Sequence, residues 1–134
     1  MAGIIVDIDG TIVFGDKPIK YTIDWVNNKS MSHTIYIVTA RYESRRQETF
    51  SLLRDLGIKY DKLFMNSLGH SHQDGLLSKK ENGLRILHDN SLVLAVENDA
   101  DARAVYASIG ISSVDPSYLP KSLIDINNVW KDIF

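Results

Sequence analysis

Residues 3–11 read GIIVDIDGT, an apolar run that ends in two acidic residues, a glycine and a threonine. Side chains alternate along extended backbone, so Asp7 and Asp9 point the same way past the end of a strand. Two such carboxylates repel each other unless a cation lies between them, and Mg²⁺ is a natural partner for oxygen ligands. Gly10 permits a tight turn close to a ligand, and Thr11 offers a hydroxyl. The alternative is a strand followed by an ordinary polar turn, and this stretch alone favours neither interpretation.

Three further apolar runs resemble the first, at residues 33–39, 62–66 and 91–97. Short runs rich in Ile, Val and Leu are typical of strands that are buried on both faces of a sheet. Four helical patterns alternate with these runs. One begins after Pro18, one ends before Gly57, one follows a capping-box pattern at 78–81, and one ends at Gly110. This alternation predicts right-handed βαβ units and a three-layer α/β/α sandwich with a mainly parallel, Rossmann-type sheet. Residues 111–114 are a candidate fifth strand.

The length of 134 residues allows one ordinary hydrophobic core, so we expect a single domain over residues 1–134. The tail from 116 to 134 is too apolar to be left in water, and we expect it to pack on the body. A dimer contact through this tail is the alternative.

The composition excludes several classes of function. With no cysteine, the chain can form neither a disulfide nor a thiolate metal site nor a cysteine nucleophile. A net charge of −2 gives no overall attraction to nucleic acid, so any such contact requires a local patch. No apolar run approaches the roughly 18 residues that span a bilayer, and the N-terminus does not resemble a signal peptide. We expect a soluble, cytoplasmic protein without membrane contact.

Polar residues follow the predicted strands at their carboxyl ends, where open parallel sheets bind ligands. Thr39-Ala40-Arg41 ends the second run, and Glu97-Asn98-Asp99 ends the fourth. In such a site one carboxylate can attack a phosphoryl group, while a second protonates the leaving oxygen and later activates water. The reaction also needs a hydroxyl and a lysine to bind the phosphate oxygens. The chain therefore carries the residue types required for phosphoryl transfer.

Four segments, taken in order, resemble the motifs of the haloacid dehalogenase (HAD) superfamily of aspartate-nucleophile phosphatases. They are IIVDIDGTI (4–12), IYIVTAR (35–41), SKKENGL (78–84) and LAVENDADARAVYASIGI (94–111). The resemblance implies Mg²⁺ as cofactor, Asp7 as nucleophile and Asp9 as general acid and base. It further implies that Thr39 binds phosphate and that Lys79 or Lys80 neutralises its charge. Helical phase with Leu84 and Leu87 favours Lys80, while the spacing from Asp74 favours Lys79.

The fourth motif departs from the pattern of the superfamily. An acidic pair is usual there, whereas this chain has Glu97 followed by Asn98. The resemblance assigns Asp7, Asp9, Glu97 and Asn98 to the metal site, with one negative charge fewer than usual. Asp99 is the residue that could substitute if the turn were displaced.

Within the superfamily, the chain is most similar to the phosphatase domain of polynucleotide kinase-phosphatase. This similarity, together with the turn after the first strand, gives Gly10, Thr11, Ala40, Arg41 and Asp74 as candidate substrate-binding residues. The gaps between the predicted strands are too short for a substantial cap domain. An uncapped site favours large phosphorylated substrates such as nucleic-acid ends, although a short flap at 14–20 could cover one base.

Three functions remain open from the sequence. The first is a Mg²⁺-dependent phosphomonoesterase that acts through an aspartyl-phosphate, with polynucleotide 3′ ends as its expected substrate. The others are a nucleotidase and a catalytically weak module that binds a phosphorylated partner. Arg45 and Arg46 alternate with acidic residues and are as compatible with a solvated helix face. We expect His70 and His72 to be exposed rather than to bind metal.

Overall fold

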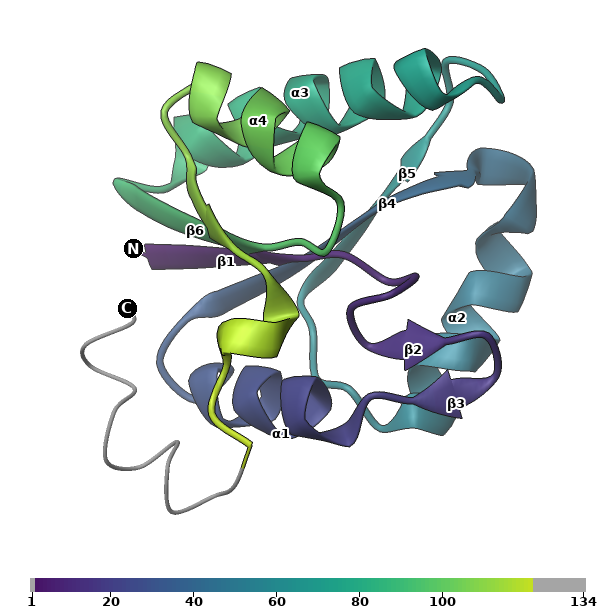
Figure 1. The fold of residues 1–134 in the computed structure, drawn as a ribbon, viewed down its shortest axis with the longest axis vertical. Helices are drawn as coiled ribbons and strands as arrows, with labels where there is room; N and C mark the ends of the chain where they lie inside the picture. The colour runs from purple at the N-terminus through teal and green to yellow at the C-terminus, as the bar shows by residue number, and fades with distance from the viewer. Residues whose placement is uncertain (1, 122–134) are drawn as a thin grey trace.

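A five-stranded parallel sheet forms the centre of the molecule, in the order β5-β4-β1-β6-β7. The computed structural model describes residues 2–121. The strands are β1 (Ala2–Val6), β4 (Thr34–Tyr42), β5 (Lys62–Asn66), β6 (Leu92–Val96) and β7 (Ser112–Val114). Helices α1 (Lys20–Lys29) and α2 (Arg46–Leu56) cover one face, and α3 (His72–Asp89) and α4 (Ala100–Ser108) cover the other (Figure 1). The predicted three-layer α/β/α sandwich is confirmed, including its fifth strand.

Successive side chains of β1 point to opposite faces of the sheet, and both faces are buried. Ile4 and Val6 pack toward the side of the sheet that contains Trp25 and Leu53, from α1 and α2. Ile5 lies in the opposite cluster with side chains of α3 and α4. Because the period of two fixes which side chains reach each helix layer, it also fixes the direction in which the residues after β1 leave the sheet.

A short hairpin of β2 (Val13–Phe14) and β3 (Lys17–Pro18) follows β1. It coincides with the predicted flap, and the side chain of Phe14 on it is exposed. Within residues 2–121 no further domain is inserted between the strands, so the expected absence of a substantial cap agrees with the fold. Short 3₁₀ turns lie at Glu43–Arg45 and Pro116–Tyr118.

The prediction for the start of α3 was wrong. The capping-box pattern at 78–81 lies inside the helix, because α3 begins at His72. Ser71 is the N-cap: its hydroxyl accepts a hydrogen bond from the backbone N–H of Asp74, and the Asp74 carboxylate accepts one from the backbone N–H of Ser71. This reciprocal pair stabilises the helix end about two turns earlier than predicted.

The buried face of α3 also differs from the predicted one. Leu84, taken from the sequence as part of the apolar stripe, is 48% exposed, while Ile86 is 1% exposed. Small residues form much of the buried face: a Cβ at Gly75 would lie 3.0 Å from the Cβ of Ala40, and one at Gly83 would lie 2.8 Å from Ile109. Of the two leucines used for the helical phase, Leu87 packs against the core cluster and Leu84 does not, so the predicted face was displaced around the helix.

The chain after β7 returns toward α1. Leu119 is buried in the core cluster on that side of the sheet, and the ammonium group of Lys121 lies 3.8 Å from the centroid of the Tyr21 ring. The first residues of the predicted tail thus pack on the body. The proposed dimer contact and the rest of the tail, 122–134, lie outside the described residues. None of the helices in residues 2–121 combines the length and the apolar character that crossing a bilayer requires.

The phase of α3 can be tested by two truncations on the same helix. Replacing Ile86 by Ala should lower the free energy of unfolding by about 2–5 kcal/mol, because it leaves a cavity under the sheet. Leu84→Ala should change it by about 0.5 kcal/mol or less, since the side chain is half in water. Urea unfolding measures both values, and equal losses for the two variants would contradict the orientation of the helix.

Candidate active site

The carboxyl ends of β1, β4 and β6 meet at one edge of the sheet. Asp7 directly follows β1, and its backbone N–H donates to the carbonyl oxygen of Val96 at 3.1 Å, which joins the ends of β1 and β6. Glu97 directly follows β6, and Thr39 lies in β4 on the other side of β1. The topology therefore brings three of the four sequence motifs together, as parallel strands with adjacent ends require.

A buried ion cluster occupies this edge. Lys79, at the centre of α3, donates from Nζ to Oδ1 of Asp7 at 3.3 Å and to Oε1 of Glu97. Asp7 and Lys79 are each 5% exposed and Glu97 is 0% exposed. Breaking such a cluster is costly, because the remaining partners are left as uncompensated buried charges. With both carboxylates ionised, the three side chains carry two negative charges and one positive charge.

The protonation of the cluster follows from burial and mutual attraction. Burial opposes the charge on Lys79, but the two carboxylates outweigh it and raise the pKa of Lys79 above its ordinary value. Burial, together with repulsion from Asp7, raises the pKa of Glu97 to about 8. Lys79 is therefore a permanent cation. A pKa of about 8 leaves Glu97 largely protonated at neutral pH, and the repulsion from Asp7 that favours this proton is the kind that a bound divalent cation would relieve.

The turn after Asp7 is tight and internally bonded. Gly10 has a φ of +82°, a conformation that favours glycine, and its N–H donates to the carbonyl oxygen of Val13 at 2.7 Å. The buried Thr11 hydroxyl lies 3.2 Å from Oδ2 of Asp7. The turn thus holds the Asp7 carboxylate from one side while Lys79 holds it from the other.

Asp9 lies at the mouth of the site rather than in the buried cluster. Arg41 donates to both carboxylate oxygens of Asp9, from Nε at 2.9 Å and from one terminal nitrogen at 2.8 Å. This bidentate ion pair lowers the pKa of Asp9 below its ordinary value, so the carboxyl is ionised while Arg41 is bound to it. Asp9 can take a proton in this state, but it can donate one only after Arg41 has moved away.

Thr39 presents a hydroxyl at the end of β4. Its Oγ1 accepts a hydrogen bond from the backbone N–H of Arg41 at 3.1 Å, which leaves its own O–H for another acceptor. Ala40, the next residue, is exposed and lines a cavity of about 170 Å³ beside Lys79. Thr39 itself is buried, and the exposed Ala40 follows it at the strand end.

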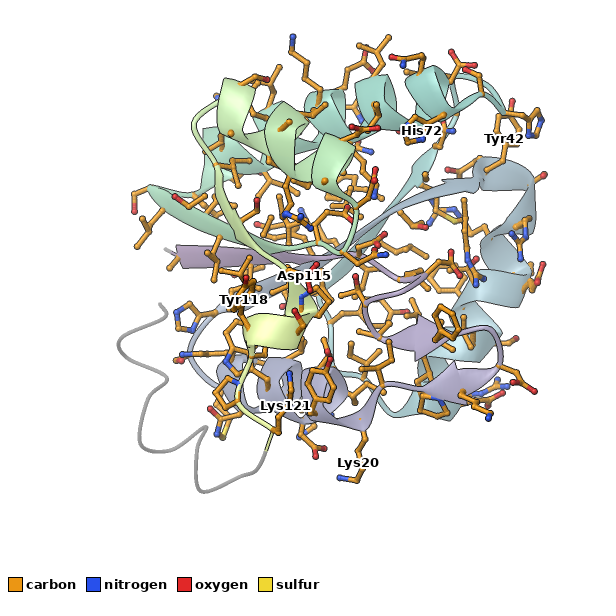
Figure 2. The ribbon with its side chains drawn as sticks, viewed as in Figure 1. Lys20, Tyr42, His72, Asp115, Tyr118 and Lys121 are labelled. Carbon is orange, nitrogen blue, oxygen red and sulfur yellow. The ribbon has the colours of Figure 1, made fainter. Side chains whose placement is uncertain are left out.

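The same cavity extends from Lys79 toward the start of α3, where its wall includes His70, His72 and Asp99. The ring of His70 lies 4.2 Å from that of Tyr42, and Figure 2 shows Tyr42 at the end of β4, at the same end of the molecule as His72. His72 and His70 are exposed, as expected. Nε2 of His72 lies 3.0 Å from a carboxylate oxygen of Asp101 at the rim.

Some candidate residues have positions outside the ion cluster. Lys80 is exposed on α3, so of the two candidate lysines the structure brings Lys79 to Asp7. The carboxylate of Asp74 caps α3, and that of Asp99 accepts a hydrogen bond from Ala102 at the start of α4. Arg45 and Arg46 pair with neighbouring glutamates on the surface, in agreement with a solvated helix face.

Two supporting residues were missed by sequence reasoning. Arg103 on α4 donates at 2.9 Å to the carbonyl oxygens of Glu97 and Asn98, and it also contacts Asp115. Asn66, buried at the end of β5, donates to the carbonyl oxygens of Ala40 and Gly69. Both hold loop backbone through carbonyl groups, which have no sequence signature.

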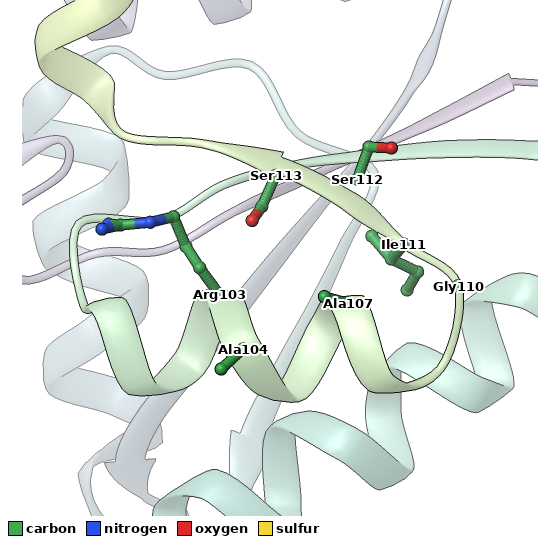
Figure 3. Close-up of a pocket in the computed structure, with 7 residues that line it drawn as sticks. All are labelled: Arg103, Ala104, Ala107, Gly110, Ile111, Ser112 and Ser113. Carbon is green, nitrogen blue, oxygen red and sulfur yellow. The ribbon is translucent and has the colours of Figure 1, made fainter.

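A wider depression of about 600 Å³ lies between α4 and β7, away from the strand ends (Figure 3). Its lining includes Ala104, Ala107 and Ile111, and Arg103 is its charged member. Arg103 is already bonded to the loop after β6, and Ser112 and Ser113 are the hydroxyl-bearing residues of this depression.

The cation that the sequence predicts would need oxygen ligands, and the described residues supply them. Oxygens of Asp7 and Glu97 and the backbone carbonyl of Asp9 converge on one point beside the turn, which the side-chain amide of Asn98 reaches as well. Carboxylate and carbonyl oxygens are the donors that Mg²⁺ prefers. The chemistry of the donor set therefore fits a hard divalent cation.

Solved structures share this fold. A chain in the structure of the Pnkp1/Rnl/Hen1 RNA repair complex has a TM-score of 0.74 at 17% sequence identity, over 85% of this chain and 42% of that chain. The NMR structure of the core domain of a candidate phosphoglycolate phosphatase from Streptococcus pneumoniae TIGR4 has a TM-score of 0.59 at 18% identity, over 97% and 95% of the two chains.

The chain thus spans less than half of the length of the first of these proteins. No family model matches the sequence, and no curated protein matches it either. Similarity at such low sequence identity shows a shared arrangement of the backbone. The positions of the motif residues come from the site geometry of this chain. The chain has the same α/β fold as these two solved structures.

Proposed function

We propose that the protein is a Mg²⁺-dependent phosphomonoester hydrolase that acts through an aspartyl-phosphate on Asp7, and that its substrates are nucleic-acid 3′ ends. The observation that carries this proposal is the buried carboxylate of Asp7 at the carboxyl edge of the sheet, bonded to Lys79 and flanked by Asp9. A nucleophilic carboxylate, a fixed cation and a second carboxylate are the groups that this chemistry requires.

In the first step an oxygen of Asp7 attacks phosphorus, and the bond from phosphorus to the leaving oxygen breaks. Asp9 supplies the proton that the leaving oxygen needs. In the second step Asp9 takes a proton from water, whose oxygen attacks phosphorus and breaks its bond to Asp7. Lys79 and the Thr39 hydroxyl stabilise the phosphoryl oxygens in both steps. A divalent cation, when bound, neutralises charge between the nucleophile and the phosphate.

Arg41 connects substrate binding to the protonation of Asp9. Its guanidinium group forms a bidentate ion pair with Asp9 in the free protein, and a phosphate can take the place of that carboxylate. Once Arg41 binds the substrate, the bond that keeps Asp9 ionised is lost, and Asp9 can hold the proton for the leaving group. Arg41 therefore acts on both the substrate and the acid.

The open edge supports a polynucleotide as substrate. With no cap among the described residues, a long chain can approach the carboxyl edge of the sheet from solvent, where Arg41 is the cation next to Asp9. Of the two similar solved structures, the chain from an RNA repair complex has the higher TM-score, 0.74 against 0.59 for the candidate phosphoglycolate phosphatase core domain, which supports this choice. A nucleotidase is the second candidate, favoured by the small cavity beside Lys79 and the ring pair of Tyr42 and His70 next to it.

Replacing the nucleophile provides the first test. Asp7→Asn should abolish phosphate release from an aryl phosphate in Mg²⁺, because an amide does not form the acyl-phosphate. Asp24→Asn, on α1 and bonded to Lys20, is the matched control and should keep the wild-type rate. Undiminished release by Asp7→Asn would reject the mechanism, as would the absence of release by the wild type.

Neighbouring lysines on α3 allow a matched comparison. Lys79→Met should lower kcat by roughly 10²–10³-fold, because the variant loses the cation that faces the phosphoryl oxygens. Lys80→Met should retain a kcat near that of the wild type, since Lys80 is exposed. Steady-state rates measure the effect, and urea unfolding confirms that both variants fold. Comparable losses at the two positions would remove Lys79 from the mechanism.

Substitution of Arg41 tests its role in binding a polynucleotide substrate. Arg41→Ala should raise KM for a 3′-phosphorylated oligonucleotide roughly tenfold, the value of one charge-assisted hydrogen bond. Arg54→Ala, whose guanidinium group faces Asp55 on the surface, serves as the control and should leave KM unchanged. If the wild type ignores the oligonucleotide and hydrolyses mononucleotides well, the nucleotidase replaces the polynucleotide phosphatase.

A further inference from the structure

The side-chain amide of Asn98 lies among oxygen atoms that converge from two loops, the one after β1 and the one after β6. One terminal atom of this amide faces hydrogen-bond acceptors, so the hydrogen-bond network assigns that atom as Nδ2. The four oxygens are Oδ2 of Asp7 at 2.8 Å, the carbonyl oxygen of Asp9 at 2.9 Å, Oε2 of Glu97 at 3.2 Å and Oγ1 of Thr11 at 3.3 Å. Two N–H groups thus point into a cage of oxygens.

The same cage is the donor set that fits a divalent cation. An amide nitrogen keeps its neighbours at hydrogen-bond distance, about 2.9 Å, whereas Mg²⁺ requires oxygen ligands at about 2.1 Å. The nitrogen and the cation therefore cannot share the position. The amide N–H groups provide part of the positive charge that the buried carboxylates of Asp7 and Glu97 lack.

The backbone around Asn98 is fixed, but its side chain has room to leave. Arg103 holds the carbonyl oxygens of Glu97 and Asn98 at 2.9 Å each, which restrains the turn. A Cβ at Gly10 would lie 2.2 Å from the terminal amide, so the amide is tightly packed against that glycine. The residue as a whole is exposed, so rotation about its side-chain bonds moves the amide into water.

We propose that the Asn98 amide occupies the cation position in the resting protein and turns aside when a divalent ion binds, so that Asn98 weakens cation binding. The inference rests on the cation site of the proposed function. It makes Asn98 a residue that sets metal affinity by competing for the site, not by acting as a ligand. Removing the amide should therefore strengthen cation binding although it adds no oxygen.

Binding of Mn²⁺ alone tests this inference, with free Mn²⁺ measured by electron paramagnetic resonance during titration of the full chain. Asn98→Ala should bind Mn²⁺ roughly tenfold more tightly than the wild type, because one set of hydrogen bonds no longer has to be broken. Asn98→Ser is the second variant, since its side chain is too short to reach the cage. Asn28→Ala on α1 is the control and should bind as the wild type does.

Asn98→Asp shows whether the cage is a cation site at all, and it should bind Mn²⁺ more tightly than the wild type. Weaker or equal binding by both Asn98→Ala and Asn98→Ser would overturn the inference, because the side chain would then be a ligand or a bystander. Failure of Asn98→Asp to bind would overturn it as well.

Phosphate release by the wild type in Mg²⁺ is measured separately, which keeps the two proposals apart. If the wild type hydrolyses the phosphate and Asn98→Ala binds Mn²⁺ less tightly than the wild type, only the role of Asn98 is rejected. Tighter binding by Asn98→Ala in a protein that releases no phosphate rejects the hydrolase and retains the competing amide.

Discussion

One buried ion pair network determines how this site is built: Lys79 between the carboxylates of Asp7 and Glu97. Charges so deep in a protein are stable only when their partners are in place. The ends of β1 and β6 must therefore stay adjacent, and α3 must lie close enough to the sheet for a lysine to reach across. Gly75 and Gly83 precede and follow Lys79 by one turn each and permit this approach.

The network also explains why the neighbouring turn is so heavily bonded. Two carboxylates share one lysine, and polar groups of Thr11 and Asn98 supplement it on the side away from α3. Arg103 and the tight turn at Gly10 hold the two loops at a separation that suits an amide. The site is thus pre-organised for an additional positive charge. Under the proposed function, the partly buried Arg41 and the exposed Asp9 are the groups that exchange partners when a substrate binds.

Much of the fold could be predicted from the sequence because its strands are short, apolar and buried on both faces. The polar residues at their ends indicated the edge where the chemistry lies. The start of α3 was missed because a weaker capping pattern inside the helix resembled an N-terminus, while Ser71 and Asp74 form the actual one. Helical phase failed for a related reason: the side of α3 that faces the sheet is lined by small and polar residues. The roles of Arg103 and of the Asn98 amide depend on contacts made across loops, which spacing does not reveal.

The central claim is that phosphorus is transferred to Asp7, and capture of the intermediate tests it most directly. Wild-type protein mixed with excess aryl phosphate and Mg²⁺ is quenched in acid within one turnover, digested and examined by mass spectrometry. The account predicts one additional phosphoryl group, sensitive to hydroxylamine, on the peptide that contains Asp7. Turnover with a phosphoryl group on another residue, or with none on any peptide of a quench shown to preserve acyl-phosphates, would contradict it.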